Sequence, residues 1–344
     1  MASKSTESKA HRKRLRLQLE SSTLPTWTTP GASWEPSVII SRSPELVKTY
    51  NPVNFKLLPN CGPFISSEEE LKRRSHLHQS RIKNAATKTA INLVYKYKAR
   101  SISEVYNLCS EDEWASLIYN GPQYQSSIQT ALDLYIKDCL AYQRRNRWEW
   151  FISKQEFLPE QEYELLNLIS AQGIDPYFFM KCLKKVLLCK DHKINTIKLW
   201  GIPNSGKSLI AQLIGQAFVC AFMSNHGSED EFFFSNFLNK SIILCEELFV
   251  TPATVEDYKS ILGGANIDVN KKYNEKQILC RTPVIITSNY KLFGRGHLNH
   301  VDEEALQLRC YNFEFNTIYK PKCTITMPAL CHVMHFLNNK DVLI

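Results

Sequence analysis

The sequence predicts an α/β fold in which a helical region precedes a parallel β-sheet. Residues 68–189 carry apolar residues three and four positions apart, which is the spacing of amphipathic helices. Three short apolar segments follow, at 194–200, 241–247 and 283–289. The first leads directly into a glycine-rich loop, and the other two end in polar side chains. Short apolar runs of this kind are typical of the buried strands of a parallel sheet.

The composition excludes several classes of protein. The 344 residues are enough for about two domains, and Lys plus Arg exceed Asp plus Glu by 42 − 34 = 8. No segment approaches the ~18 apolar residues of a spanning helix, and the amino end lacks the apolar core of a signal peptide. The 11 cysteines include no C-x-x-C pair, so we expect neither a disulfide framework nor a zinc site. These features predict a soluble, intracellular, reduced protein without membrane contact.

Residues 1–60 are expected to form a disordered basic tail. Prolines recur every few residues there, and apolar periodicity is nearly absent. Six of the first 16 residues are Lys or Arg, against the single acid Glu7, so the rest of the chain is nearly neutral. The compact cluster at 9–17 is interpreted as a nuclear-import signal or a phosphate-binding arm, and the alternative is a solvated charged tail.

The helical region contains features whose roles the sequence leaves open. Residues 95–98 (YKYK) and 144–148 (RRNRW) suit nucleic-acid contacts, but they equally suit helices whose aromatic rings pack inward. His76 and His78 flank one apolar residue, as in the metal-binding pair of rolling-circle nickases, and Tyr95 is the nearest tyrosine after them. Their surroundings are polar and helical rather than those of a buried strand, so we expect no nickase activity.

The loop after the first apolar segment carries the clearest chemistry. Residues 201–208 (GIPNSGKS) match G-x-x-x-x-G-K-[ST], with a strand pattern before them and a helical pattern after them. In such a loop, backbone N–H groups surround a phosphate at a helix N-terminus. We expect Lys207 to bridge the β- and γ-phosphates and Ser208 to bind Mg²⁺. The residues expected to bind the nucleotide are Gly201, Pro203, Asn204, Ser205, Gly206, Lys207 and Ser208.

Acidic and amide side chains end the next two apolar segments. Glu246 and Glu247 end the second, 246 − 207 = 39 residues after Lys207, and Asn289 ends the third. Because the carboxyl ends of parallel strands share one edge, these side chains should converge on the nucleotide. We expect Glu246 to bind Mg²⁺ and Glu247 to accept a proton from the attacking water. Asn289 is expected to contact the γ-phosphate or to orient that water.

A β-hairpin is predicted between the second and third apolar segments. Two arms rich in β-forming residues flank the sequence NKKYN within residues 263–280. Lys271, Lys272 and Tyr273 at this tip suit contact with a nucleic-acid backbone and stacking on a sugar or base. The alternative is an ordinary exposed turn.

The order of these motifs resembles that of superfamily 3 helicases, the AAA+ replication motors of small DNA viruses. The resemblance is carried by WGIPNSGKS, ILCEE, YKSILGGANIDVNKKYNEK, TPVIITSN and LQLRCYNFEF, over roughly residues 190–318. The helicase part of parvovirus and densovirus large non-structural proteins is most similar, and the short chain resembles the shortened replication proteins of bidnaviruses. The resemblance implies an AAA+ type P-loop ATPase with ATP and Mg²⁺ as cofactors.

The resemblance also implies roles for further residues. Lys272 would grip DNA with Tyr273 beside it, and Arg309 would be an arginine finger for the neighbouring subunit's nucleotide. Lys259 is a weaker match to a second basic residue facing that nucleotide. The implied activity is a DNA helicase moving 3′→5′ on single-stranded DNA as a hexameric ring. The implied partners are replication-fork DNA and viral or host replication proteins, in the host cell nucleus. The alternatives are a nucleotide-binding DNA scaffold and a genome-packaging ATPase.

Together these expectations divide the chain into five parts. They are a basic tail at 1–60, a helical region of unclear role at 61–115, a helical oligomerisation collar at 116–190, the helicase domain at 191–320 and a C-terminal extension at 321–344. A nuclease remnant is one interpretation of the second part. The last part contains Cys323, Cys331 and His332 without the usual zinc spacing, and we expect an ordinary hydrophobic extension there.

Overall fold

The computed structural model describes most of the second of two units, 1–41 and 42–344, into which the chain divides. The described residues are 67–119, 121–224, 233–271 and 274–340. The expected basic tail with its cluster at 9–17 lies outside them, as do Lys272 and Tyr273 of the expected hairpin tip.

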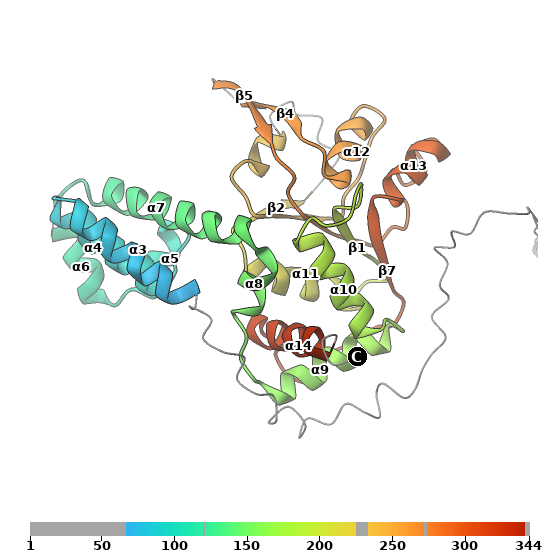
Figure 1. Cartoon of the computed structure of the whole chain (residues 1–344), viewed down its shortest axis with the longest axis horizontal. Helices are drawn as coiled ribbons and strands as arrows, with labels where there is room; N and C mark the ends of the chain where they lie inside the picture. The colour runs from blue at the N-terminus through green and yellow to red at the C-terminus, as the bar shows by residue number, and fades with distance from the viewer. Residues whose placement is uncertain (1–66, 120, 225–232, 272–273, 341–344) are drawn as a thin grey trace, which may run out of the picture. The chain divides into compact units, whose positions relative to one another are not determined.

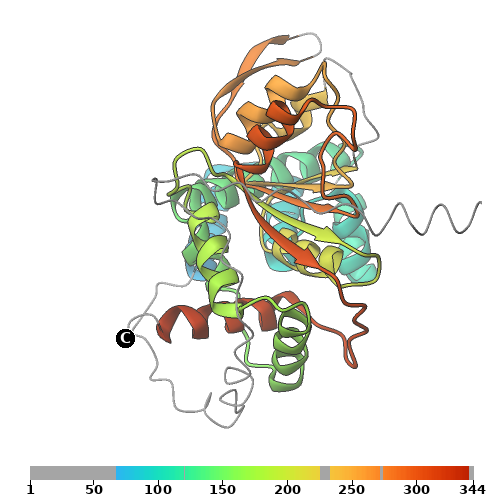
Figure 2. The ribbon, with the colours of Figure 1, turned by 90° about the vertical axis from the view of Figure 1, so that its right-hand side faces the viewer.

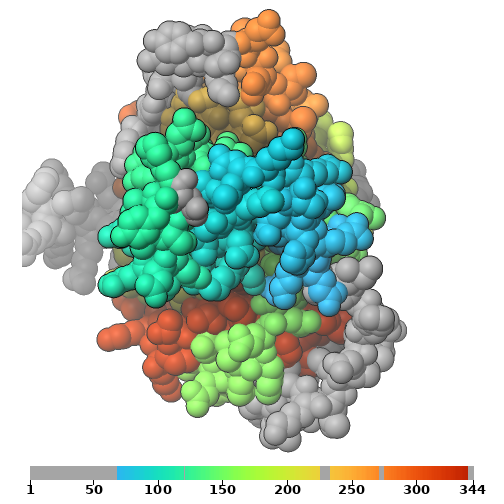
Figure 3. Space-filling model, turned by 90° about the vertical axis from the view of Figure 1, so that its left-hand side faces the viewer, coloured from blue at the N-terminus to red at the C-terminus, as the bar shows by residue number. Residues whose placement is uncertain are grey.

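Helices form the amino-terminal part of the described chain, as the apolar periodicity predicts (Figure 1). They are α3 (Ser67–Arg81), α4 (Ala85–Tyr97), α5 (Ile102–Leu108), α6 (Glu111–Tyr119) and α7 (Tyr124–Arg145). Asn84 caps α4 by accepting hydrogen bonds from two backbone N–H groups of the first turn. Ile91 of α4 and Ile128 of α7 are fully buried where these helices pack together. Figure 3 looks onto the face of the molecule that these helices cover.

His76 and His78 lie on the helix α3, as their polar surroundings predict. Side chains two residues apart on an α-helix differ in direction by about 200°, so this pair cannot share a metal ion. His78 Nε2 instead lies 2.9 Å from Asp138 Oδ2, and the Tyr95 hydroxyl donates to the same oxygen at 2.7 Å. Burial and this hydrogen bond raise the pKa of Tyr95, which opposes its activation as a nucleophile.

Three helices connect α7 to the sheet, and the last described helix packs against all of them (Figures 1 and 2). They are α8 (Arg147–Ile152), α9 (Pro159–Ala171) and α10 (Pro176–Leu187), with α14 (Met327–Lys340) as the last. Leu330 and Val333 of α14 are fully buried in the same core as Phe151 of α8. The expected C-terminal extension therefore contributes a helix to this core. Among the described helices, none is both long and apolar enough to cross a membrane.

A five-stranded parallel sheet forms the centre of the described structure, in the order β2-β3-β6-β1-β7. Its strands are β1 (Thr196–Gly201), β2 (Cys220–Ser224), β3 (Ile242–Glu246), β6 (Val284–Ser288) and β7 (Cys310–Phe315). The expected α/β class is confirmed, and the three apolar segments correspond to β1, β3 and β6, with β1 extending one residue beyond the first segment. The edge strands β2 and β7 both carry exposed as well as buried side chains. The sequence of β7 mixes polar and apolar residues, whereas β2 is apolar but begins only three residues after α11, with no Gly or Pro between them.

Successive residues of β3 enter two different cores. Leu244 packs with the core that contains α11 (Lys207–Gln216), whereas Ile243 and Cys245 pack with the core that contains α12 (Val255–Gly263). Helices therefore cover both faces of the sheet, which explains why its central strands are apolar throughout. Beyond α12, β4 (Ile267–Lys271) pairs with β5 (Asn274–Leu279) in antiparallel fashion, which confirms the predicted hairpin.

A buried asparagine immediately before β1 joins three parts of this layered structure. Asn195 Nδ2 donates to the carbonyl oxygens of Ile261 in α12, at 3.2 Å, and of Thr282 before β6, at 2.7 Å. Its Oδ1 accepts a hydrogen bond from Arg281 Nε at 3.2 Å. Because Asn195 is fully buried, water cannot replace these bonds.

We predict that Asn195→Ala lowers the free energy of unfolding by about 2–3 kcal/mol, because the Thr282 carbonyl and the Arg281 Nε–H lose their bonds to this side chain and the Ile261 carbonyl keeps only the N–H of Gly264. Urea unfolding followed by tryptophan fluorescence measures this change. The matched control is Asn92→Ala, at an exposed position on α4, and it should change the stability by no more than about 0.5 kcal/mol. Equal stabilities of the two variants would contradict the structural role of Asn195.

Candidate nucleotide-binding site

The carboxyl ends of β1, β3 and β6 lie together at one edge of the sheet. Trp200 at the end of β1 is in register with Ser288 of β6, and Glu246 at the end of β3 is in register with Thr287. The glycine-rich loop follows β1, and Asn289 follows β6. The parallel arrangement therefore brings the expected phosphate-binding loop next to the expected catalytic side chains.

The loop at 201–206 has a backbone that other residue types would strain. Gly201 has a φ of 138°, and a Cβ placed there would lie 2.2 Å from the carbonyl oxygen of Phe315 on β7. Gly206 has a φ of 94° and forms the N-cap of α11. Glycine at these two positions lets the chain turn tightly from β1 into the helix. The N-terminus of α11 thereby faces the loop, as a phosphate-binding site requires.

Lys207, the first residue of α11, joins the loop to the tip of β6. Its Nζ donates to the carbonyl oxygens of Gly201 at 3.0 Å and Ile202 at 2.5 Å, and to Ser205 Oγ at 3.2 Å. It also donates to Asn289 Oδ1 at 3.2 Å. Burial lowers the pKa of Lys207, and a nearby carboxylate opposes this change. A phosphate group at this point would meet a partly desolvated ammonium, whose attraction for anions is stronger than in water.

The carboxylate that opposes the pKa change of Lys207 belongs to Glu247. Glu247 accepts hydrogen bonds from the backbone N–H of Asn289 at 3.1 Å and 3.3 Å, one to each carboxylate oxygen. Its own N–H donates to the Thr287 carbonyl at 2.8 Å. Glu247 has a φ of 51°, a left-handed conformation that costs a non-glycine residue about 1–2 kcal/mol. The structure thus brings Lys207, Asn289 and Glu247 together, as the sequence predicts.

Glu246 lies near the face of α11 that carries Ser208. Its Oε1 accepts a hydrogen bond from Gln212 Nε2 at 3.3 Å, and Gln212 is one turn after Ser208 on the same side of the helix. Hydroxyl and carboxylate oxygens are ligands that Mg²⁺ prefers, and Mg²⁺ usually completes its shell with waters and substrate phosphates. Ser208 and Glu246 therefore fit the expected magnesium site.

Arg309 and Lys259 form a second basic cluster, away from the lysine of the loop. Arg309 Nε donates to the Lys259 carbonyl at 2.8 Å, and its Nη1 donates to a carbonyl of α13 (His300–Gln307). Lys259 Nζ forms ion pairs with Glu256 and Asp302, each at 2.6 Å. The contacts of both basic residues are thus made with α12 and α13. Their action on a neighbouring subunit's nucleotide stays a prediction.

Comparison with known proteins identifies the family. Residues 83–340 match the family model of the parvovirus non-structural protein NS1, which is most of the chain. The chain belongs to the parvovirus NS1 family. Protein Rep52 of adeno-associated virus 2 is 26% identical over 208 residues, which cover 59% of this chain and 52% of Rep52. The initiator protein NS1 of human bocavirus 3 is 29% identical over 153 residues, which cover 44% of this chain and 20% of that protein.

Solved structures and relative lengths complete the comparison. The JCV helicase structure is 13% identical and gives a TM-score of 0.48, with 76% of this NS1-family chain and 84% of that chain covered. The matched segments amount to about a fifth of the bocavirus NS1 protein and about half of Rep52. The chain thus matches only part of each of these relatives.

Two other groups of expected residues lie elsewhere in this NS1-family chain. Lys271 is the last residue of β4, and the remaining hairpin-tip residues lie outside the described part. Cys331 is fully buried in α14, and His332 Nδ1 lies 3.0 Å from Glu162 Oε1. Within the described ranges, no group of three or more His, Cys, Asp and Glu side chains is placed to hold a metal ion. Cys331 and His332 thus belong to the packed helix α14, and Cys323 precedes it.

Arg295 is a member of the site that the sequence analysis does not find. Its Nη2 donates to the Glu247 carbonyl at 3.1 Å and lies 3.7 Å from Glu247 Oε2. The guanidinium also stacks over the ring of Tyr290 at 4.2 Å and lies 5.2 Å from that of Phe249. Arg295 thus supports the strained backbone and the carboxylate of Glu247 at once. The one available sequence signal was an arginine between two glycines shortly after Asn289.

We predict that Arg295→Ala lowers the kcat of ATP hydrolysis about tenfold and changes the KM for ATP less than about twofold. The reason is that the Glu247 carboxylate loses its fixed position, whereas the glycine-rich loop is untouched; tenfold corresponds to about 1.4 kcal/mol. Steady-state hydrolysis measures both constants. Arg295→Lys should recover only part of kcat, because an ammonium cannot stack and bond in the same way. The control Arg73→Ala, on the exposed side of α3, should match the unaltered protein. A larger effect on KM than on kcat would refute the positioning role.

Proposed function

We propose that the chain is an ATP-dependent DNA helicase of viral genome replication. The observation that carries this proposal is the line of contacts from Lys207 through Asn289 to Glu247. It puts a phosphate-binding ammonium, a polar amide and a carboxylate base beside one another at the strand tips. A structure that only held a nucleotide would need the ammonium but not the oriented carboxylate. Membership of the parvovirus NS1 family supports the replicative role.

Hydrolysis follows from what these residues do. Lys207 exchanges carbonyl contacts within its own loop for the β- and γ-phosphate oxygens of ATP. Glu247 accepts the proton of the attacking water, and the Asn289 side chain orients that water or the γ-phosphate. Mg²⁺ bound by Ser208 and Glu246 would neutralise the charge that develops on the phosphate oxygens. Arg295 keeps the backbone of Glu247 in place while its carboxylate acts.

A second subunit would complete the site in this proposal. Arg309 and Lys259 lie with α12 and α13 of their own chain and not with Lys207, so they are suited to act on a neighbour's nucleotide. We extend the proposal to a hexameric ring around one DNA strand, with movement 3′→5′. The hairpin of β4 and β5, with Lys271 at its tip, would contact that strand and shift with each hydrolysis.

The proposed setting is replication of viral DNA in the host cell nucleus. The basic cluster at 9–17 is the sequence feature that supports nuclear import. Replication-fork DNA and other viral or host replication proteins are the proposed partners.

We predict ATP-dependent unwinding of a forked duplex that carries a 3′ single-stranded tail, and none of a duplex with only a 5′ tail. Lys207→Ala should abolish unwinding, because the phosphates lose their main cationic contact. The matched control Lys190→Ala, at an exposed turn, should unwind normally. Gel separation of a labelled strand measures the reaction. Unwinding by Lys207→Ala would contradict the helicase proposal, and DNA-stimulated hydrolysis without strand separation would favour a packaging motor.

We predict that Arg309→Ala lowers turnover about 10³-fold or more but spares nucleotide binding, as expected for an arginine finger. An experiment that mixes Arg309→Ala with Lys207→Ala subunits tests whether Arg309 acts on its own chain's nucleotide or on that of a neighbouring chain. Arg309→Ala subunits keep Lys207 and Lys207→Ala subunits keep Arg309, so mixed oligomers contain some complete sites. Their combined activity should exceed that of either variant alone. No recovery on mixing would show that Arg309 does not serve a neighbour, and Arg145→Ala is the control at an exposed arginine on α7.

A further inference from the structure

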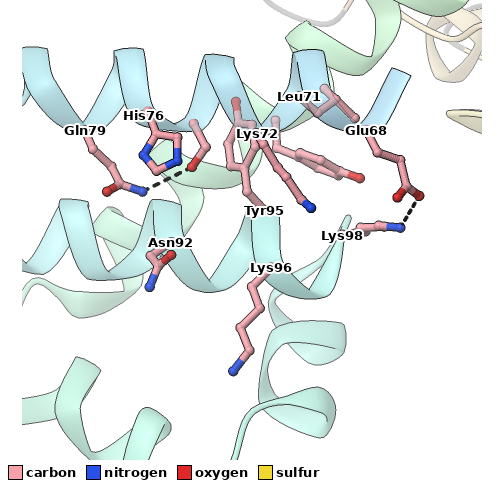
Figure 4. Close-up of a pocket in the computed structure, with 11 residues that line it drawn as sticks. Glu68, Leu71, Lys72, His76, Gln79, Asn92, Tyr95, Lys96 and Lys98 are labelled. Carbon is pink, nitrogen blue, oxygen red and sulfur yellow. Dashed lines mark hydrogen bonds and ion pairs between the residues drawn. The ribbon is translucent and has the colours of Figure 1, made fainter. Parts of the chain in front are cut away.

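Two hollows at the surface of the described chain, one on the amino-terminal helices and one between them and β2, are both lined by the same lysine. The first has a volume of about 300 Å³ and is lined largely by residues of α3 and α4 (Figure 4). The second has a volume of about 450 Å³ and lies where the segment after α4 meets the edge strand β2. Lys98, at the carboxyl end of α4, lines both hollows, so they are adjoining parts of one surface. We call this surface, made of the residues that line the two hollows, the Lys98 groove.

The Lys98 groove is basic. Its cationic residues are Lys72, Lys96, Lys98, Arg100 and Lys240, and its carboxylates are Glu68 and Glu104. Lys98 pairs with Glu68 at 2.5 Å and Lys96 with Glu113 at 2.7 Å. For Lys72 and Lys240, the described part of the chain offers no carboxylate within ion-pair distance. The groove therefore keeps an excess of positive charge that an anionic ligand can neutralise.

Aromatic and amide side chains lie among these charges. Tyr95 is half-buried: its hydroxyl donates to Asp138 and its ring packs against that of Tyr135, with centroids 5.0 Å apart, so a ligand can reach only the part of the ring that lines the first hollow. Asn92 and Gln79 line the same hollow and offer neutral donors and acceptors, as Figure 4 shows. Phe222 of β2 lines the second hollow and is 64% exposed. Rings beside cations are the combination that binds unpaired bases and their phosphates.

The groove also joins the two basic, aromatic runs whose roles the sequence leaves open. Residues 95–98 supply three of its lining side chains. Arg144 of the second run donates from Nη2 to the carbonyl of Lys240, at 3.4 Å, and so lies beside the second hollow. Tyr97 and Trp148 instead pack inward, and the Tyr97 hydroxyl donates to Glu113. Each run therefore has an aromatic residue that packs inward, and basic residues of the first run and Arg144 of the second lie at or beside the groove.

We propose that the Lys98 groove binds single-stranded DNA, at a site separate from the hairpin. Phosphates would lie near Lys72, Lys98 and Lys240, and an unpaired base would stack on Tyr95 or Phe222. The proposal rests on the proposed function, because a helicase keeps the strand it has separated within reach. A duplex would hide its bases from both rings, and an acidic peptide would leave the rings and amides without a defined role.

The first experiment measures the affinity of the full chain for a fluorescein-labelled oligothymidylate by anisotropy, without nucleotide. Lys72→Glu combined with Lys240→Glu should raise Kd about tenfold or more at moderate salt. It should also flatten the slope of log affinity against log salt, because each phosphate contact on a single strand contributes about 0.7 to that slope. The matched control combines Lys83→Glu with Lys322→Glu, which make the same change in charge at exposed positions outside the groove. It should stay within about twofold.

A second experiment uses only the unaltered chain, so its result does not depend on whether a substituted chain folds correctly. An oligonucleotide containing 5-iododeoxyuridine is crosslinked to the unaltered chain, and the modified peptides are identified by mass spectrometry. Crosslinks at Tyr95 or Phe222 support the proposal. Crosslinks confined to the hairpin at 267–279, with equal Kd values for groove and control variants, would overturn it.

Two other outcomes would also contradict the proposal that the Lys98 groove binds single-stranded DNA. If the groove variant alters the mass of the oligomer but not DNA affinity, the surface is a contact between protein chains and the proposal is wrong. Equal losses of affinity in the groove and control variants would show a general charge effect rather than a site. The helicase proposal is tested separately: it fails if the unaltered chain shows no ATP-dependent unwinding, whatever the DNA affinity of the groove.

Discussion

The site depends on a single ammonium group placed where strands end. Lys207 Nζ contacts four oxygen atoms, three in its own loop and one on Asn289. Other contacts join the loop to the ends of α9 and β7, through the Ser205 carbonyl and the Ile202 N–H, but the contact to Asn289 is made by Lys207. With this contact, the loop after β1 and the tip of β6 form one unit, and Asn289 in turn donates to Glu247. The nucleotide site is therefore organised by the residue that is itself expected to bind the phosphates.

The segment after Asn289 connects this site to the surface that carries Arg309. The buried Lys198 of β1 donates to the Lys291 carbonyl at 2.5 Å, and burial lowers the pKa of Lys198 to about 8. Glu303 of α13 accepts hydrogen bonds from the N–H groups of Phe293 at 2.7 Å and of the next residue at 3.0 Å. The same segment contributes Arg295 to Glu247. Displacement of the segment would thus be felt both at the chain's own Glu247 and at α13, from which a carbonyl binds Arg309.

The sequence was informative where a residue's role depends on its neighbours along the chain. The loop at 201–208, the acids after β3 and the amide after β6 follow from local patterns, because strand tips in a parallel sheet must converge. Arg295 could not be found in this way, since its partner Glu247 is 48 residues away and a loop arginine has no local signature. The strands β2 and β7 were not predicted for other reasons. Exposed polar residues interrupt the apolar pattern of β7, and no Gly or Pro separates the apolar segment of β2 from the end of α11. The Lys98 groove likewise depends on packing between helices and β2, which no single segment encodes.

The position of α14 in the sequence affects how the protein folds during synthesis. This helix comprises residues 327–340, yet its buried side chains share a core with α8, α9 and α10, which precede the sheet. During synthesis the amino-terminal helices emerge from the ribosome long before the segment that covers them. Their apolar faces must stay in water, or beside a chaperone, until residues 327–340 have also been synthesised. This core therefore closes only after the whole sheet, which lies between α10 and α14 in the sequence, has been synthesised.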